Sequence, residues 1–132
     1  MQGQYRRNIA GLASALGVIG VVLPACAQQA PDPKEAGARY GQALGAVLAC
    51  PGFRPGAGLG PLMSRFSGSD LETFKAQAAP VLGLWQQVKT CNAAATGPDQ
   101  CQVVQVKSCR EALAEVGPTG TQQPRLIEPE PR

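Results

Sequence analysis

The stretch that decides the fold reads SDLETFKAQAAPVLGLWQQVKTCN and covers residues 69–92. It begins like a capping box, because Ser69 and Glu72 stand three apart just ahead of an apolar run. Apolar side chains then recur at steps of three and four residues, as on one face of a helix; they are Leu71, Phe74, Ala78, Val81, Leu82, Trp85 and Val88. This pattern predicts a helix over residues 70–92, with a kink at Pro80.

The segment before this stretch is predicted to form another helix, over residues 34–50. Asp32 is expected to cap it, and the proline that follows suits the first helical position. Its inward residues are predicted to be Ala36, Tyr40, Leu44, Val47 and Leu48. Gly37, Gly41 and Gly45 lie four apart on one side of the helix, and this smooth strip predicts close approach of another helix backbone or of a partner.

The segment after the opening stretch is predicted to form a third helix, over residues 100–116. Asp99 is its expected N-cap, and Gly117 followed by proline is typical of a helix end. The side chains expected to face inward are Cys101, Val103, Val106, Cys109, Leu113 and Val116. The three helices predict an all-α fold, a small three-helix domain spanning residues 34–117.

Two segments carry no strong periodicity. Residues 51–68 are rich in glycine and proline, and they predict a long loop between the first two helices, with a short helical turn around residues 61–66. The glycines from Gly56 to Gly60 are interpreted as loop punctuation, because no P-loop lysine follows them. The apolar residues of this loop are expected to pin it onto the helices or to form an interaction surface; they are Phe53, Leu59, Leu62, Met63 and Phe66. Residues 118–132, rich in proline, glutamine and charge, are predicted to be a disordered tail.

Four cysteines in the predicted domain indicate two disulfides, because an even number in a small exported domain is typical of a disulfide framework. Cys91 closes the second helix and Cys101 opens the third across a short turn, which favours their pairing. Cys50 is then left to pair with Cys109. The spacing lacks C-x-x-C and the chain has no histidine, so a metal site or a redox pair is a weaker reading, and no cofactor is expected.

Residues 1–27 have the three parts of a secretory signal peptide: two arginines, an apolar run, and the small-residue site Ala25-Cys26-Ala27. The apolar run is about 15 residues, shorter than the roughly 20 that a membrane-spanning helix needs. Cleavage after Ala27 would leave residues 28–33 as a linker. The sequence before Cys26 also fits a lipoprotein box, in which Cys26 would carry a lipid anchor. Twin arginines would indicate a different export route, but the neighbouring residues do not extend that motif.

Loss of the two arginines with the signal leaves ten Lys and Arg against nine Asp and Glu. With a net charge so close to zero and no basic stripe, nucleic acid is not an expected partner. The chain also lacks the histidine and the G-x-S-x-G context of common acyl-transfer triads. No constellation of residues reaches the specificity of a catalytic signature.

We therefore expect a periplasmic or secreted, non-enzymatic accessory or protein-binding module of a bacterial cell envelope, whose partner is another envelope protein. A small envelope hydrolase that uses a carboxylate pair is the alternative from another class. The acidic residues that could supply such a pair are Asp70, Glu72, Glu111 and Glu115. A surface lipoprotein anchored through Cys26 is the third hypothesis.

Overall fold

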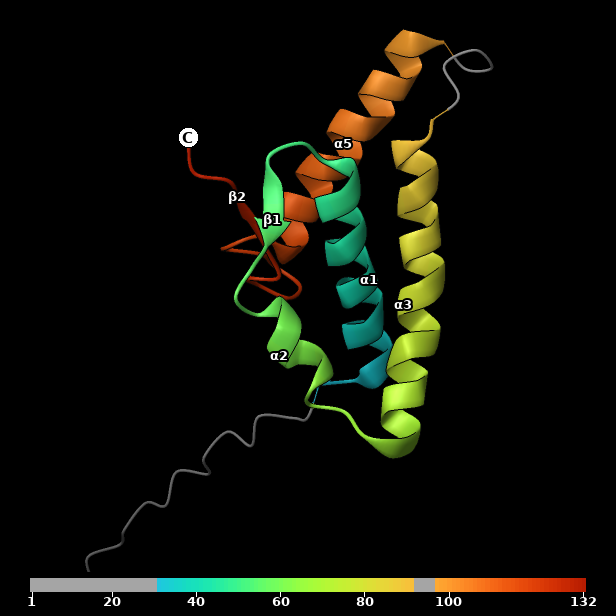
Figure 1. The fold of residues 1–132 in the computed structure, drawn as a ribbon, viewed down its shortest axis with the longest axis vertical. Coiled ribbons are helices and arrows are strands. Elements are labelled where there is room, and N and C mark those ends of the chain that lie inside the picture. The colour runs from blue at the N-terminus through green and yellow to red at the C-terminus, as the bar shows by residue number, and fades with distance from the viewer. Residues whose placement is uncertain (1–30, 92–96) are drawn as a thin grey trace, which may run out of the picture.

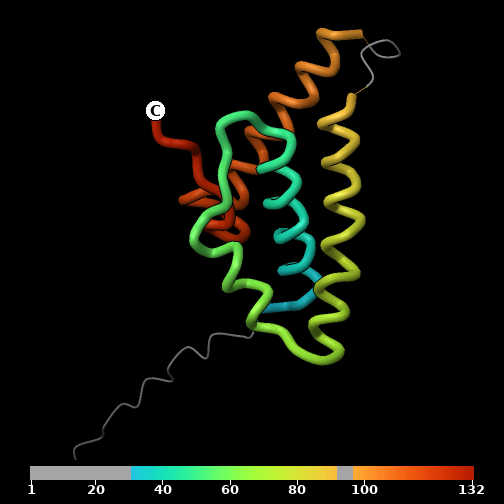
Figure 2. Tube along the Cα trace, in the orientation of Figure 1, coloured from blue at the N-terminus to red at the C-terminus, as the bar shows by residue number. Residues whose placement is uncertain are grey.

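A computed structural model describes residues 31–91 and 97–132, and these residues form four helices and two short strands. In chain order the elements are α1 (Pro33–Ala49), β1 (Phe53–Pro55), α2 (Leu59–Met63), α3 (Gly68–Lys89), α5 (Pro98–Val116) and β2 (Ile127–Pro129). Figures 1 and 2 show α1 between α3 on one side and α2 with the two strands on the other. The mostly helical, two-disulfide fold is confirmed, and the small sheet is an addition to the predicted all-α class.

The helix ends follow the sequence signals in part. Asp32 caps α1 as predicted, because the Lys34 backbone N–H donates to Asp32 Oδ1 at 2.9 Å. At the end of α5, the Gly117 N–H donates to the carbonyl oxygen of Leu113 at 3.1 Å. The prediction of a capping box that begins at Ser69 is wrong, because α3 begins at Gly68 and Ser69 therefore lies inside the helix. The expected Asp99 cap is also wrong, since α5 begins at Pro98 and its N-cap residue is Gly97.

The glycines of α1 are where α3 packs. A Cβ atom at Gly37 would collide with the carbonyl oxygen of Phe74, and one at Gly41 with that of Ala78. A Cβ at Gly45 would overlap the side chain of Trp85. The two helices can therefore come this close only because these side chains are absent. We call this contact the glycine seam. The glycine strip therefore packs against α3 inside the domain and not against a partner.

Because α1 and α3 approach so closely, the residues that α1 buries differ in part from those predicted to face inward. The residues that α1 buries are its smallest, namely Ala36, Gly37, Gly41, Ala43, Gly45, Ala46 and Ala49. Tyr40, Leu44 and Val47 are only partly buried against the core, and Leu48 is 51% exposed. The prediction that Leu48 faces inward is wrong, because the side of α1 that meets its neighbours most closely has room only for Gly and Ala.

The C-terminal segment is ordered, so the predicted disordered tail over residues 118–132 is wrong. β2 pairs antiparallel with β1, with Phe53 opposite Pro129. The side chains of Leu126 and Ile127 are only 1% and 0% exposed, and the Leu126 N–H donates to the carbonyl oxygen of Val116 at 3.0 Å. Two apolar residues in a polar tail are enough here, because the core accepts both and the backbone finds hydrogen-bond partners.

The loop between α1 and α3 is held by this segment. The N–H groups of Gly56 and Gly58 donate to the carbonyl oxygens of Leu126 and Arg125, at 2.8 and 2.9 Å. A Cβ at Gly56 would collide with the Arg125 carbonyl oxygen, so glycine is required for this close approach. These glycines therefore dock the C-terminal segment, and the two N–H groups are already used rather than free for a phosphate. The segment predicted as a long loop contains the strand β1, and it contains α2 in place of the short helical turn expected around residues 61–66.

The core draws on every part of the described fold. The largest fully buried side chains come from α2, α3, α5 and the C-terminal segment; they are Phe74, Leu62, Leu126, Ile127 and Val116. The ring of Phe74 lies 5.1 Å from the rings of both Tyr40 and Phe66, measured between centroids. Trp85 is buried too, as the sequence predicts. With so few bulky residues, the domain relies on these contacts and on its disulfides.

Candidate functional site

Both disulfides have the predicted pairing. Cys50 at the end of α1 bonds to Cys109 on α5, and Cys91 after α3 bonds to Cys101 near the start of α5, with Cα separations of 5.7 and 5.6 Å. Two disulfides in one small domain are consistent with an extracellular or periplasmic location. Within residues 31–91 and 97–132, no three metal-ligating side chains come together.

The loop residues expected to form an interaction surface serve mainly as core. Leu59 and Leu62 are buried, and Phe53 and Phe66 are partly buried against the same cluster. Only Met63 is exposed, at 38%. The interpretation of these five residues as one exposed surface is therefore wrong, whereas their expected role in pinning the loop to the helices is confirmed.

The structure brings one of the two candidate carboxylate pairs into a hollow. Glu111 and Glu115 on α5 line a depression of about 220 Å³ between α1, α3 and α5. The other lining residues are Gln42, Leu84, Trp85, Val88 and Ser108. Asp70 and Glu72 lie elsewhere, at the start of α3, where Glu72 forms an exposed ion pair with Lys75 at 3.5 Å. Of the acidic residues considered, only Glu111 and Glu115 share a concave site.

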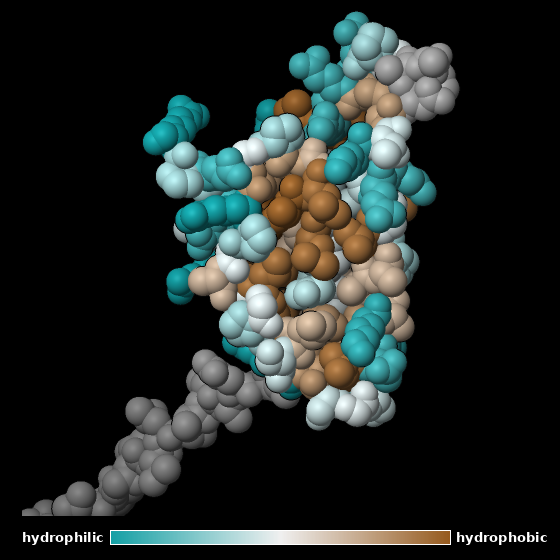
Figure 3. Space-filling view, viewed as in Figure 1, coloured by the Kyte–Doolittle hydropathy of each residue, from teal (hydrophilic) through white to brown (hydrophobic). Residues whose placement is uncertain are grey.

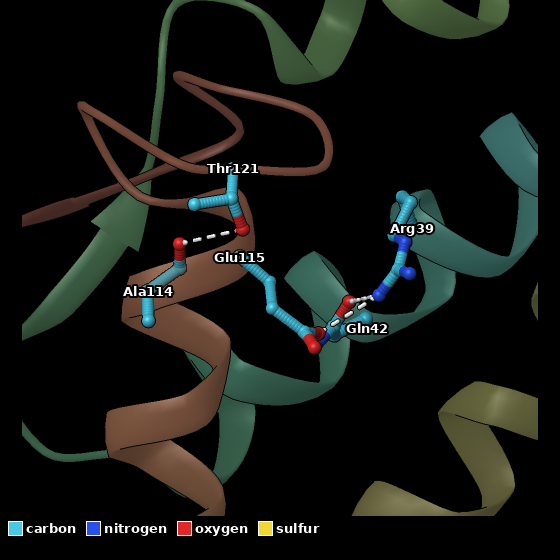
Figure 4. A network of polar contacts seen from close by, with 5 residues as sticks. All are labelled: Arg39, Gln42, Ala114, Glu115 and Thr121. Atoms are coloured by element: carbon cyan, nitrogen blue, oxygen red, sulfur yellow. Dashed lines mark hydrogen bonds and ion pairs between the residues drawn. The ribbon is translucent and has the colours of Figure 1, made fainter.

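One carboxylate of that hollow is already engaged, as Figure 4 shows. Arg39 Nη1 donates to Glu115 Oε2 at 2.8 Å, and Gln42 Nε2 donates to the same oxygen at 2.6 Å. Arg39 Nη1 also donates to Gln42 Oε1 at 3.0 Å. This network ties α1 to α5 and gives Glu115 a structural role that its position in the sequence does not reveal.

The N-terminal half of α5 exposes three valines that the sequence does not single out as a surface. Val103, Val104 and Val106 are 65%, 46% and 49% exposed, and we call them the valine face. The prediction that Val103 and Val106 point inward is wrong. The opposite side of α5 faces the domain, where Gln105 Nε2 donates to the carbonyl oxygen of Ala49 at 2.7 Å and Ala112 is fully buried.

Three shallow hollows are lined in part by residues of the valine face. Val103 and Val106 line one of about 430 Å³ together with Gln102, Lys107 and Arg110. Val103 and Val104 line a second, of about 410 Å³, and Val106 lines a third, of about 330 Å³, beside Phe53. Lys107 has only a long ion pair with Glu111, at 3.9 Å, and Arg110 has none within the described ranges. The valine face thus has an apolar centre, with Lys107 and Arg110 beside the first hollow and Asp99 in the lining of the second.

A second apolar area is visible in Figure 3, over the C-terminal half of α1. In this part of α1, Leu48 is 51% exposed, whereas Leu44 and Val47 pack partly against the core. The valine face has three exposed valines on a single helix, so it is the more complete candidate for a binding surface.

The predicted signal peptide over residues 1–27 lies outside the described residues, as does the candidate lipidation site Cys26. The same holds for the first part of the predicted linker over residues 28–33, up to residue 30. Among the helices described, none is both long enough and apolar enough to cross a membrane.

Comparisons with protein-family models, with curated proteins and with solved structures find no match to this chain. A function for the protein has to be argued from its own residues.

Proposed function

We propose that this protein is a periplasmic or secreted, non-enzymatic protein-binding module of a bacterial cell envelope, and that it binds its partner through the valine face. The observation that carries the proposal is the exposure of Val103, Val104 and Val106, between 46% and 65%, on one helix of a small domain. Apolar side chains gathered on a surface cost free energy in water, and such patches are typical of interaction sites.

The basic side of the border, beside Val103 and Val106, indicates the chemistry of the partner. Lys107 and Arg110 line the same hollow as Val103 and Val106, and Arg110 has no ion pair among the described residues. A partner segment that presents apolar side chains flanked by aspartate or glutamate complements both features. Charge complementarity of this kind raises association rates and selects the partner more than it adds raw affinity.

A selection of random linear peptides on the oxidised protein tests this proposal. Enriched peptides are expected to combine apolar and acidic residues and to bind more weakly as salt rises. Val103→Ser with Val106→Ser should reduce binding of the enriched peptides at least about tenfold, for a loss of about 1.4 kcal/mol or more. Lys107→Gln should reduce it less, and only at low salt.

Leu48→Ser is the matched control, because Leu48 is exposed to a similar degree, 51%, but belongs to α1. Binding by this variant should stay at the wild-type level. Enriched peptides that bind the valine double variant as well as the wild type, or that are lost only with Leu48→Ser, would overturn the assignment of the surface.

Export is supported by the two disulfides and by the signal-like pattern over residues 1–27. The intact mass of the protein recovered from an exporting host decides this part. A mass that begins at Gln28 supports a free envelope protein, and a mass that begins at Cys26 with acyl chains makes it a lipoprotein. Recovery of the uncleaved chain with four free thiols in the domain would contradict export.

A small envelope hydrolase is the second candidate, favoured by the shared hollow of Glu111 and Glu115. The hollow, at about 220 Å³, is smaller than the 300 Å³ or so that small-molecule sites usually occupy. The Glu115 Oε2 atom is also occupied by Arg39 and Gln42. Glycoside hydrolysis by the purified protein that disappears in Glu111→Gln would establish this function, and equal rates in the two proteins would exclude it.

A further inference from the structure

A separate hollow lies between α2 and the C-terminal segment, away from the valine face. Its volume is about 390 Å³. Leu62 and Leu126 lie beneath it and are almost completely buried, and its exposed apolar lining comes from Ala57, Pro61 and Pro124. Its polar lining comes from Arg65, Gln123 and Arg125. No acidic residue is part of the described lining.

The two arginines of this hollow differ from Arg39 and Arg54, and Arg110 shares with them the lack of a carboxylate partner among the described residues. Arg39 and Arg54 have carboxylate partners, Glu115 and Glu128, at 2.8 and 3.0 Å. Arg65 and Arg125 have no ion pair within the ranges that the structure describes. Two like charges at one hollow leave an uncompensated positive potential there, which an anion would neutralise.

The backbone holds Arg125 in an unusual conformation. It has a φ of 68°, the only positive value at a non-glycine position in the described chain, and this left-handed region is uncommon for a side chain of its size. Its N–H donates to the carbonyl oxygen of Gly117 at 2.7 Å, and its own carbonyl oxygen accepts from the N–H of Gly58 at 2.9 Å. The point from which this side chain extends is thereby fixed on the rim of the hollow.

We infer that this hollow binds an oxyanion, either a carboxylate or a phosphate, on a ligand with an apolar body. A guanidinium is planar and donates two parallel hydrogen bonds to a carboxylate or a phosphate. Arg65 and Arg125 approach from different elements, the turn after α2 and the C-terminal segment, so they can hold one oxyanion between them. Ala57, Pro61 and Pro124, the exposed apolar residues of the lining, then contact the apolar part of the ligand.

Nuclear magnetic resonance titration of the oxidised protein tests the inference, with side-chain Nε–Hε and backbone amide signals as the readout. The probes are inorganic phosphate, acetate, phenyl phosphate and benzoate, at constant ionic strength. Saturable shifts are expected at Arg65 and Arg125, with tighter binding of the phenyl-bearing member of each pair. Saturation by the phosphates alone or by the carboxylates alone identifies which oxyanion the site prefers, and either supports it.

Arg125→Gly keeps the positive φ accessible, so this variant should fold, and Arg65→Gln changes an exposed turn residue. Each should weaken binding about tenfold or more, the loss expected for one charge-assisted hydrogen bond. Lys89→Gln is the matched control: it removes one exposed positive charge at the far end of α3 (Figure 1) and should leave binding unchanged. Shifts that do not saturate, or equal weakening in all three variants, would show that the hollow has no oxyanion site.

Discussion

The glycine seam and the N-terminal half of α5 treat apolar residues in opposite ways. In the seam, α1 presents glycine and alanine, and α3 comes close enough to bury Trp85 and Phe74. On α5, three valines point outward, and this half of the helix is joined to the rest by the Cys91–Cys101 disulfide and by the hydrogen bond from Gln105 to Ala49. One region is held by packing and the other mainly by a covalent link.

The difference teaches how a domain with few bulky residues can still keep apolar side chains free. The seam uses small residues to bring backbones together, so a large part of the core is formed without large side chains on α1. Val103, Val104 and Val106 lie outside that core, and we expect them to contribute little to its stability. We propose that these exposed valines serve binding instead.

The largest effect that we expect on the free energy of unfolding comes from removal of the disulfides. The Cys50–Cys109 bond closes a loop with a sequence separation of 59, and Cys50→Ala with Cys109→Ala should lower the free energy of unfolding by about 4 kcal/mol. Cys91→Ala with Cys101→Ala should cost less than the roughly 3 kcal/mol that its shorter loop gives, because this half of α5 can open locally. Urea unfolding measures both. A greater loss of stability from removing the Cys91–Cys101 bond would contradict the claim that the N-terminal half of α5 contributes less to stability.

The next effect concerns the C-terminal segment, which completes the packed region. Ile127→Ala should destabilise the domain by about 3 kcal/mol, the usual cost of deleting a fully buried aliphatic side chain. Met63→Ala, at a residue 38% exposed, should change stability by no more than about 0.5 kcal/mol. Thermal unfolding compares them. If both substitutions had equally small effects, the C-terminal segment would not be packed on the core, as its composition suggests.

A pair of identical substitutions isolates the seam itself. Gly41→Ala should cost about 2 kcal/mol, because the new methyl group collides with the carbonyl oxygen of Ala78. Gly83→Ala, on α3 where nothing lies within 4 Å of the new atom, should stabilise by about 0.5 to 1 kcal/mol. Chemical denaturation of both variants gives the two signs. If both stabilised the domain, the close packing of α1 on α3 would be wrong.

The smallest effect belongs to the valine face. Val103→Ser and Val106→Ser should each alter the free energy of unfolding by less than about 0.5 kcal/mol, as exposed positions usually do. The same variants are the ones expected to lose peptide binding. A loss of stability above about 1 kcal/mol in denaturant unfolding would mean that these valines are packed, and it would remove the reason to assign them to binding.

Local signals made several features predictable. The Asp32 cap, the end of α5 at Gly117, and the pairing of all four domain cysteines depend on residues close in sequence or on the ends of neighbouring helices. The glycine strip also predicted close approach, because glycines four apart lie on one side of a helix. The sequence left open whether another helix or a partner would use that strip.

Features that depend on distant residues could not be predicted in this way. Leu126 and Ile127 are only two apolar residues in a polar tail, and their burial depends on β1, where Ile127 lies opposite Pro55. The exposure of Val103 and Val106 was missed because valines at helical spacing indicate one face without saying which way it points. The shared hollow of Glu111 and Glu115, and the one at Arg65 and Arg125, arise where separate elements meet.

The central claim is that packing holds the glycine seam, whereas the N-terminal half of α5 is held less firmly to the domain. Amide hydrogen exchange of the oxidised wild-type protein tests this claim most directly. The account predicts that amides of α1 around Gly41 exchange only through global unfolding, whereas those from residue 101 to residue 106 exchange faster, through local opening. Equal protection of the two regions would contradict the account, because it would make the N-terminal half of α5 part of the packed core.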